Sequence, residues 1–255
     1  MIYREISSQG RRRIWKTFSA AFILWGHAVA MAAISPNMIS QADHLYWNRH
    51  QNGNLESSVA LLQSQPADEP EILWRLGRSL VRLGEKRVSK SEKLVIFSRA
   101  ESLLRRAVVL EPQSPDAHFW LGIAMGRRGE TRGILRSLFL VGPLKREMRE
   151  VLKLNPNHGG AHHVLGEMLF EIPMVAGGSK KGAVRELETA ASLEPDRSSH
   201  FTALAEVYLS VGDRAKAKAS LEHVFAIKTP ADPSEYADDV QDAREMLKKA
   251  GLMSP

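Results

Sequence analysis

The sequence contains no cysteine, and aromatic residues make up only 7% of its 255 residues. The lack of cysteine excludes disulfides, thiolate catalysis, cysteine-ligated metal sites and a lipidated lipobox cysteine. Hydrophobic residues nevertheless make up 44% of the chain, which is enough for the core of one or two globular domains. The sequence therefore predicts a folded protein with a hydrophobic core and no disulfides.

The positive charge is concentrated at the start of the chain. The formal net charge is +6, and residues 1–32 contribute Arg4, Arg11, Arg12, Arg13 and Lys16 against Glu5. This segment accounts for +4, so only +2 remains for everything after it. A charge this small does not favour nucleic-acid binding by the rest of the chain, and we expect none.

The first 33 residues have the pattern of a secretory signal peptide. The basic region ends at Lys16, the apolar run FSAAFILWGHAVAMAA follows, and Ala28 and Ala30 form one of the Ala-x-Ala cleavage patterns. The apolar run is shorter than the roughly 20 residues that span a bilayer. We therefore expect export, with a periplasmic or secreted protein after cleavage. The alternative is a protein anchored in the membrane by an uncleaved leader.

A repeated helical pattern predicts the fold. Leu-Gly or a close relative recurs in RLGRSLVRLGE, WLGIAMGRRGE, VLGEMLFEIP and ALAEVYLSVGD. Prolines close successive units at Pro112, Pro156, Pro195 and Pro230, spaced 44, 39 and 35 residues apart. A tetratricopeptide unit has about 34 residues. We predict an all-α tetratricopeptide-type solenoid of four to five helical hairpins over residues 37–233, with insertions, and a C-terminal capping helix over residues 234–255.

Two insertions lengthen the repeat units. KRVSKSEKLVIF is expected only to extend a helix. The second, TRGILRSLFLVGPLKREMREVL, replaces a standard second helix and contains the run LFLVGP, which is more apolar than a solvated loop. We therefore expect this run to be buried, against the solenoid or against a partner.

The stretches HFWLGIAMGRRGETRGILRSLFLVGPLKREMREVLKLNP and AHHVLGEMLFEIPMVAGGSKKGAVRELETAASLEP resemble two related tetratricopeptide families. These are the T component of TRAP transporters and the regulator of microtubule dynamics family, and the resemblance extends from Glu71 to Lys228. The first family implies a periplasmic, oligomeric scaffold that contacts a solute-binding protein and passes on a small organic ligand. The chain departs from it by lacking a lipobox cysteine. Because the leader predicts export, nothing in the sequence favours microtubule binding.

Two motifs resemble catalytic or cofactor sites without matching them. His158 and His162, and likewise His163, Glu167 and Glu171, are four residues apart on helix faces, as zinc ligands can be, but they depart from H-E-x-x-H. GGSKKGA lacks the spacing of a phosphate-binding P-loop. We expect histidines in a repeat helix, no cofactor, no metal and no catalytic residue. A metal-dependent hydrolase remains the less favoured alternative.

The glycine positions predict which residues line the concave face. In each first helix the leucine-glycine side is packed, so positions three before and one or five after the glycine point inward. The predicted partner-binding residues are Trp74, Arg78, Arg82, Phe119, Ile123, Arg127, His163, Glu167, Phe170, Glu171, Thr202 and Glu206. Aromatic residues on such a face are common anchors for a partner.

The sequence thus favours a non-enzymatic, exported scaffold that binds a protein partner through its concave face in a cell-envelope assembly. A periplasmic solute-binding protein of a transport system is one candidate partner. The alternative is a carrier of a small hydrophobic ligand, with LFLVGP as a wall of its pocket. The sequence leaves homo-oligomerisation open.

Overall fold

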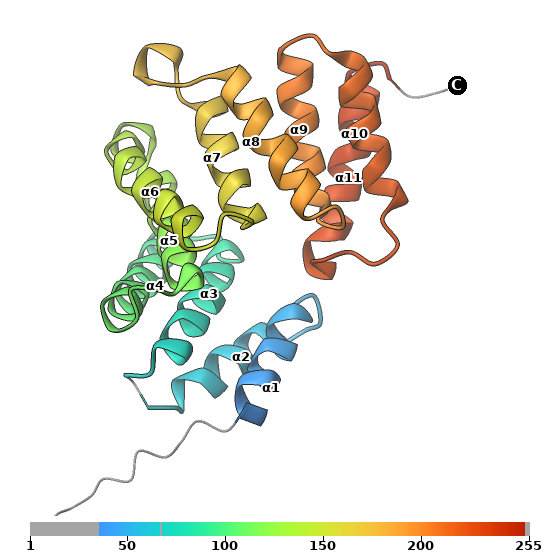
Figure 1. The fold of residues 1–255 in the computed structure, drawn as a ribbon. Helices are drawn as coiled ribbons and strands as arrows, with labels where there is room; N and C mark the ends of the chain where they lie inside the picture. The colour runs from blue at the N-terminus through green and yellow to red at the C-terminus, as the bar shows by residue number, and fades with distance from the viewer. Residues whose placement is uncertain (1–35, 67, 253–255) are drawn as a thin grey trace, which may run out of the picture. The chain divides into compact units, whose positions relative to one another are not determined.

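The computed structural model describes residues 36–66 and 68–252, and every regular element in them is a helix (Figure 1). The predicted signal peptide lies outside the described residues. The first helices of the hairpins are α1 (Pro36–Trp47), α3 (Pro70–Glu85), α5 (Pro115–Arg132), α7 (Gly159–Glu171) and α9 (Ser198–Ser210). Their partners are α2 (Asn54–Gln63), α4 (Lys90–Leu110), α6 (Ile134–Leu154), α8 (Lys180–Leu193) and α10 (Arg214–Ala226). A short 3-10 helix, η1 (Met174–Ala176), lies between α7 and α8, and α11 (Pro233–Lys249) follows the last hairpin.

These helices confirm the predicted tetratricopeptide-type solenoid with five hairpins and a C-terminal helix. Within each hairpin, a glycine of the first helix brings the second helix close. A Cβ atom at Gly77 would lie 2.4 Å from Cγ of Leu104, and one at Gly166 would lie 2.6 Å from Cγ of Leu187. Both leucines are fully buried. A side chain at either glycine would therefore push the two helices of its hairpin apart.

Polar residues and prolines in the connections between helices begin the helix that follows. The side chains of Ser114, Ser179 and Asp213 accept hydrogen bonds from backbone N–H groups in the first turns of α5, α8 and α10. Proline occupies the first turn of α5 and α11, where its missing N–H is not needed. These caps explain why the repeat spacing in the sequence predicts the helix boundaries.

Two histidines make polar contacts across the junctions between repeat units. His118 lies within hydrogen-bonding distance of Glu147 (2.7 Å) and of the Pro112 carbonyl (3.1 Å). His162 has the corresponding contacts with Glu186 and the Pro156 carbonyl at the same two distances. The hydrogen bond with Glu147 raises the pKa of His118. The closing proline of a unit is thus tied to the next hairpin through its carbonyl.

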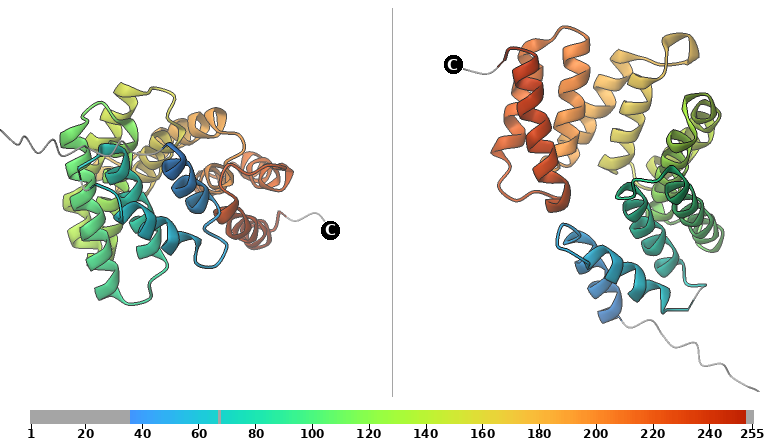
Figure 2. Two further views of the ribbon diagram at one scale, coloured as in Figure 1. Left: turned by 90° about the horizontal axis from the view of Figure 1, so that it is seen from below. Right: turned by 180° about the vertical axis from the view of Figure 1, so that it is seen from behind.

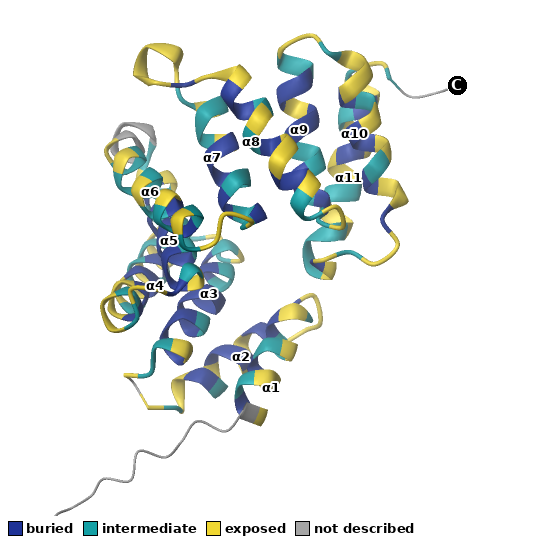
Figure 3. Ribbon diagram, viewed as in Figure 1, coloured by how far each residue is buried: buried dark blue, intermediate teal, exposed yellow. Residues whose placement is uncertain are grey.

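The two insertions form long helices, α4 and α6, of 21 residues each. The prediction that LFLVGP is buried against the solenoid is wrong at Phe139, whose side chain is 82% exposed. The helix therefore presents this large apolar side chain to solvent. The loop between α7 and α8 is also exposed, as Figure 3 shows, with Met174 and Val175 at its tip.

The core consists of clusters that follow the order of the hairpins. One cluster joins α1 to α5, and another joins α8 to α11, where Ala243 and Leu247 of α11 are buried. A smaller cluster around Met148 and Val164 connects α6 and α7. Helix α11 therefore covers the apolar face of the last hairpin, as the sequence predicts.

The first hairpin lies beside the start of α11 (Figure 2). Polar contacts connect these segments, and we call this group of contacts the polar latch. Arg49 pairs with Asp232 at 2.6 Å and lies 3.3 Å from Glu235, which in turn pairs with Arg82 at 2.5 Å. Ser234 donates a hydrogen bond to the Trp47 carbonyl at 3.1 Å. The hydrophobic clusters on the two sides of this contact are separate. The latch therefore joins the two ends of the solenoid mainly through charge.

Candidate functional site

The inner side of the solenoid encloses a concave cavity of about 1120 Å³. Its lining comes from α1, α3, α5, α7, α9 and α11, from residues at the helix junctions, and from Arg214 of α10. The first helices of the hairpins thus form the wall, because their glycine side is packed against the second helices outside them. The polar latch lies at the edge of this cavity, with Arg82, Asp232 and Glu235 among the lining residues.

One side of the concave cavity is aromatic and basic. Tyr46, Trp47, Phe119 and Trp120 line it, and their rings meet edge to face: Tyr46 and Trp120 have centroids 6.3 Å apart. The guanidinium of Arg78 lies 3.7 Å from the ring centroid of Tyr46. This stacking fixes the arginine against the wall, so the side chain is buried and does not reach into the open space.

The structure places most of the predicted partner-binding residues in the lining. These are Arg78, Arg82, Phe119, Ile123, Arg127, His163, Glu167, Thr202 and Glu206. They come from four different helices, α3, α5, α7 and α9, and the solenoid brings them to one cavity. That they bind a partner stays a prediction.

Three predicted residues lie elsewhere. Trp74 is 6% exposed and packs in the core between α1 and α3, because the first hairpin covers the inner face of α3 at that turn. Phe170 packs against the C-terminal hydrophobic cluster. Glu171 is the exposed last residue of α7, beyond the end of the cavity wall. These three residues are not among the lining residues of the cavity, and whether they contact a partner stays a prediction.

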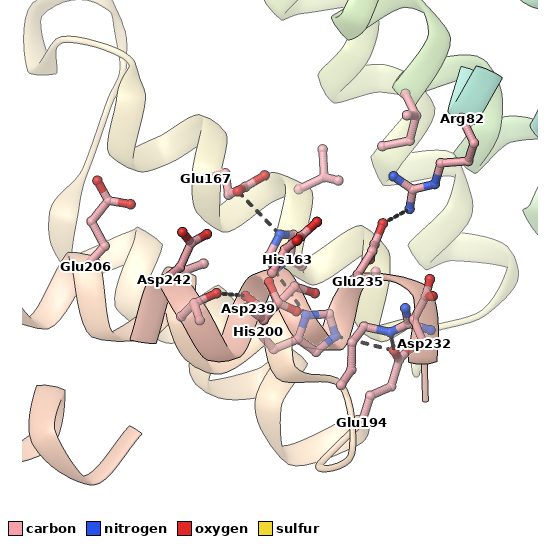
Figure 4. A pocket seen from close by; sticks show the side chains of 18 of the residues that line it. Arg82, His163, Glu167, Glu194, His200, Glu206, Asp232, Glu235, Asp239 and Asp242 are labelled. Carbon is pink, nitrogen blue, oxygen red and sulfur yellow. Dashed lines mark hydrogen bonds and ion pairs between the residues drawn. The ribbon is translucent and has the colours of Figure 1, made fainter. Parts of the chain in front are cut away.

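Sequence reasoning missed the opposite side of the cavity, which is acidic and belongs largely to α11 (Figure 4). Along one face of this helix lie five carboxylates, which we call the acidic stripe: Glu235, Asp238, Asp239, Asp242 and Glu245. Their spacing of three or four residues is a helical-face pattern that is visible in the sequence. The prediction for this helix covers only its apolar capping face, so it does not include the stripe.

Burial and crowding change the protonation of this acidic side. Burial, together with Glu235, Asp242 and Asp232, raises the pKa of Asp239 to about 6, although Ser198 donates a hydrogen bond to it at 2.5 Å. Burial and the neighbouring carboxylates of Glu171 and Glu167 also raise the pKa of Glu206. The cavity therefore holds carboxylates that repel each other.

Two of the residues considered as metal ligands, His163 and Glu167, lie in a row of close polar contacts with His200 and Glu194. His163 Nε2 lies 3.4 Å from Glu167, and the Nδ1 atoms of His163 and His200 are 3.0 Å apart. Glu194 lies 3.3 Å from the far nitrogen of His200, whose pKa burial lowers to about 4. His158 instead caps α7 by accepting from the Ala161 N–H. Within residues 36–66 and 68–252, no three of these side-chain types are placed to hold a metal ion.

Comparison with known proteins confirms one of the two resemblances. Residues 38–181, more than half of the chain, match the family described as regulator of microtubule dynamics protein 1-3. The chain belongs to this family. The matched region runs from α1 to the start of α8, so the acidic stripe of α11 lies outside it.

Individual members of the regulator of microtubule dynamics family are distant in sequence. Regulator of microtubule dynamics protein 1 of Mus musculus is 24% identical over 224 residues, 80% of this chain and 70% of the mouse protein. The Bos taurus protein of the same name is 27% identical over 148 residues, 57% of this chain and 45% of the bovine protein. The chain thus spans less than half of the bovine relative.

The fold is also found in a solved structure. A thermophilic tetratricopeptide protein of Thermus thermophilus superposes with a TM-score of 0.62 at 19% identity and covers 80% of this chain and 98% of that one. The likeness confirms the solenoid fold. In the described part of the chain no helix has the length and apolar character to cross a bilayer.

Proposed function

We propose that this member of the family is a non-enzymatic scaffold that holds a segment of a partner protein in the concave cavity. The observation that carries this proposal is the convergence of inward residues from successive hairpins on one cavity. Its volume of about 1120 Å³ exceeds the 300 to 1,000 Å³ of typical small-molecule pockets. A peptide segment matches this size better than a small ligand.

The lining also argues against a carrier of a small hydrophobic molecule. Half of the 32 lining residues are charged, which would leave many polar groups unsatisfied around an apolar ligand. Residues 139–143 of the LFLVGP run are not among the lining residues, so this run does not form a wall of the cavity. The lining contains tyrosine, tryptophan, phenylalanine and arginine, which are enriched at protein interfaces.

The setting that we propose is a cell-envelope assembly, reached by export through the predicted signal peptide. The support for this step is the sequence of the leader, and a solute-binding protein of a transport system is the candidate partner. Fractionation of cells that express the full chain tests the export step separately from partner binding. A chain found only in the cytosol would contradict export and leave the scaffold proposal standing.

Filling the cavity is expected to abolish partner capture. Ala203 lines the cavity, and replacing it with tryptophan would occupy the space between α9 and the opposite wall. Ala215 is exposed on α10 and does not line the cavity, so Ala215→Trp adds the same side chain outside it. Capture from the protein's own cells is compared by quantitative mass spectrometry, after thermal melting shows that both variants fold.

We expect the Ala203→Trp chain to lose at least 90% of a partner that the wild-type chain and the Ala215→Trp chain both capture. Equal capture by all three proteins would show that the partner binds elsewhere. In that case the proposed function of the concave cavity would be wrong.

A further inference from the structure

The basic residues in the lining of the concave cavity are already neutralised or engaged within the chain. Arg78 pairs with Asp43, Arg82 with Glu85 and Glu235, Arg127 with Glu85 and Glu130, Arg197 with Glu194, and Lys249 with Glu245, while Arg214 donates to the Ala250 carbonyl. The cavity therefore offers little positive charge to an incoming partner, although its first half is rich in arginine.

Several carboxylates in the same lining have no such partner. Asp116, Glu206, Asp238, Asp239 and Asp242 form no ion pair with any residue of the described part of the chain. Four of the five lie on α9 and α11. The charge that is open to a partner is thus negative and concentrated on one wall.

The geometry of the acidic stripe suits an extended partner peptide better than a single small ion. Its two end residues are held, Glu235 by Arg82 and Glu245 by Lys249, and the unpaired Asp238, Asp239 and Asp242 lie between them. From Glu235 to Glu245 the helix rises about 15 Å, at 1.5 Å per residue. An extended peptide covers that length with about five residues.

The lining of the cavity also contains apolar surface, on the wall opposite the stripe and on α9 and α11. Phe119 and Ile123 lie in its lining on α5, and Leu209 and Met246 lie in it on α9 and α11. Lysine and arginine side chains pack their apolar stems on such surface while their charged ends reach carboxylates. A small inorganic cation would leave this apolar surface uncovered.

We propose that the partner segment bound in the concave cavity is rich in lysine and arginine, and that the acidic stripe of α11 recognises it. This proposal rests on the proposed function, since it names the chemistry of the occupant of the same cavity. The reason for the proposal is charge complementarity. The unpaired carboxylates would face a cationic segment, while the arginines of the opposite wall stay in their internal ion pairs. A basic segment would also relieve the mutual repulsion of the stripe.

The test uses the full chain and two labelled 15-residue peptides that contain leucine and alanine with either lysine or glutamate at every third position. Binding is followed by fluorescence anisotropy. The variant Asp238→Asn with Asp242→Asn removes two unpaired, exposed charges from the stripe. The matched control, Glu56→Gln with Glu222→Gln, removes two exposed charges from α2 and α10, outside the cavity.

We expect the lysine peptide to bind at least tenfold more tightly than the glutamate peptide. The stripe variant should weaken that binding about tenfold, and the control variant by less than twofold. Higher salt should weaken binding to the wild-type chain, because the charges are solvent-accessible. Unchanged binding of the lysine peptide to the stripe variant would overturn the proposal. So would a wild-type chain that binds the polycation spermine but not the lysine peptide.

Failure of this proposal can be told apart from failure of the proposed function. If Ala203→Trp abolishes partner capture but the captured segment is acidic or neutral, the cavity is the binding site and the chemistry inferred for its occupant is wrong. If Ala203→Trp leaves capture intact and no peptide binds, both the cavity and its chemistry are wrong.

Discussion

Replacing Arg49 with methionine is expected to lower the free energy of unfolding by about 3 kcal/mol, because it removes one partner of a buried ion pair. The side chains of Arg49 and Asp232 are each only 4% exposed. Without the guanidinium, the carboxylate of Asp232 remains buried with no cation beside it. Urea denaturation of the wild-type and variant chains, followed by circular dichroism, measures the difference.

A double variant separates the charge from the packing at the polar latch. Asp232 uses one oxygen for Arg49 and the other to accept the Ser234 N–H at the start of α11. Asparagine keeps that cap and carries no charge, so Arg49→Met with Asp232→Asn is expected to recover most of the lost stability. A single variant as stable as wild type would show that the buried pair does not hold the two ends together.

Replacing Asp239 with asparagine is expected to stabilise the protein by about 1 to 2 kcal/mol at pH 7.5. The pKa of this carboxyl is raised to about 6 in the folded chain, against an ordinary value of 3.8. Between these values the folded state binds a proton more readily than the unfolded state, so stability falls as the pH rises from about 3.8 to about 6 and stays lower above that. Each pKa unit corresponds to about 1.4 kcal/mol, reduced here because the side chain is partly exposed.

The pH dependence of this difference identifies its cause. Below about pH 3.8 the carboxyl is protonated in both states, so the stabilising effect of Asp239→Asn should disappear there. The exposed neighbour Asp238 is the control, and Asp238→Asn should change stability by less than about 0.5 kcal/mol at either pH. An effect of Asp239→Asn that is independent of pH would point to packing and not to charge.

The repeat pattern predicts the fold and much of the cavity wall because both depend on local spacing. On α5, the offsets from Gly122 correctly place Phe119, Ile123 and Arg127 in the lining. The same offset fails for Trp74, because α1 packs over that turn of α3 and no local pattern specifies this. The prediction is best where neighbouring repeats are alike and weakest next to the first hairpin.

Features that join distant parts of the chain were not predictable from the repeats. Arg49 and Asp232 are 183 residues apart, and neither lies in a motif that marks it for the polar latch. The acidic stripe is different, since its spacing can be read directly from the sequence. Whether the stripe lines the cavity depends on which face of α11 turns inward. That orientation is set by the burial of Ala243 and Leu247 against the last hairpin.

The proposed function requires the concave cavity to be the surface that binds a partner. The most direct measurement places a photoreactive benzoyl-phenylalanine at Phe119, in the cavity lining, or at Val109, which is 77% exposed on α4. The full chain is irradiated in its own cells, and crosslinked peptides are identified by mass spectrometry. We predict a crosslinked partner segment from position 119 and none from position 109. The same partner crosslinked from position 109 and not from position 119 would contradict the claim.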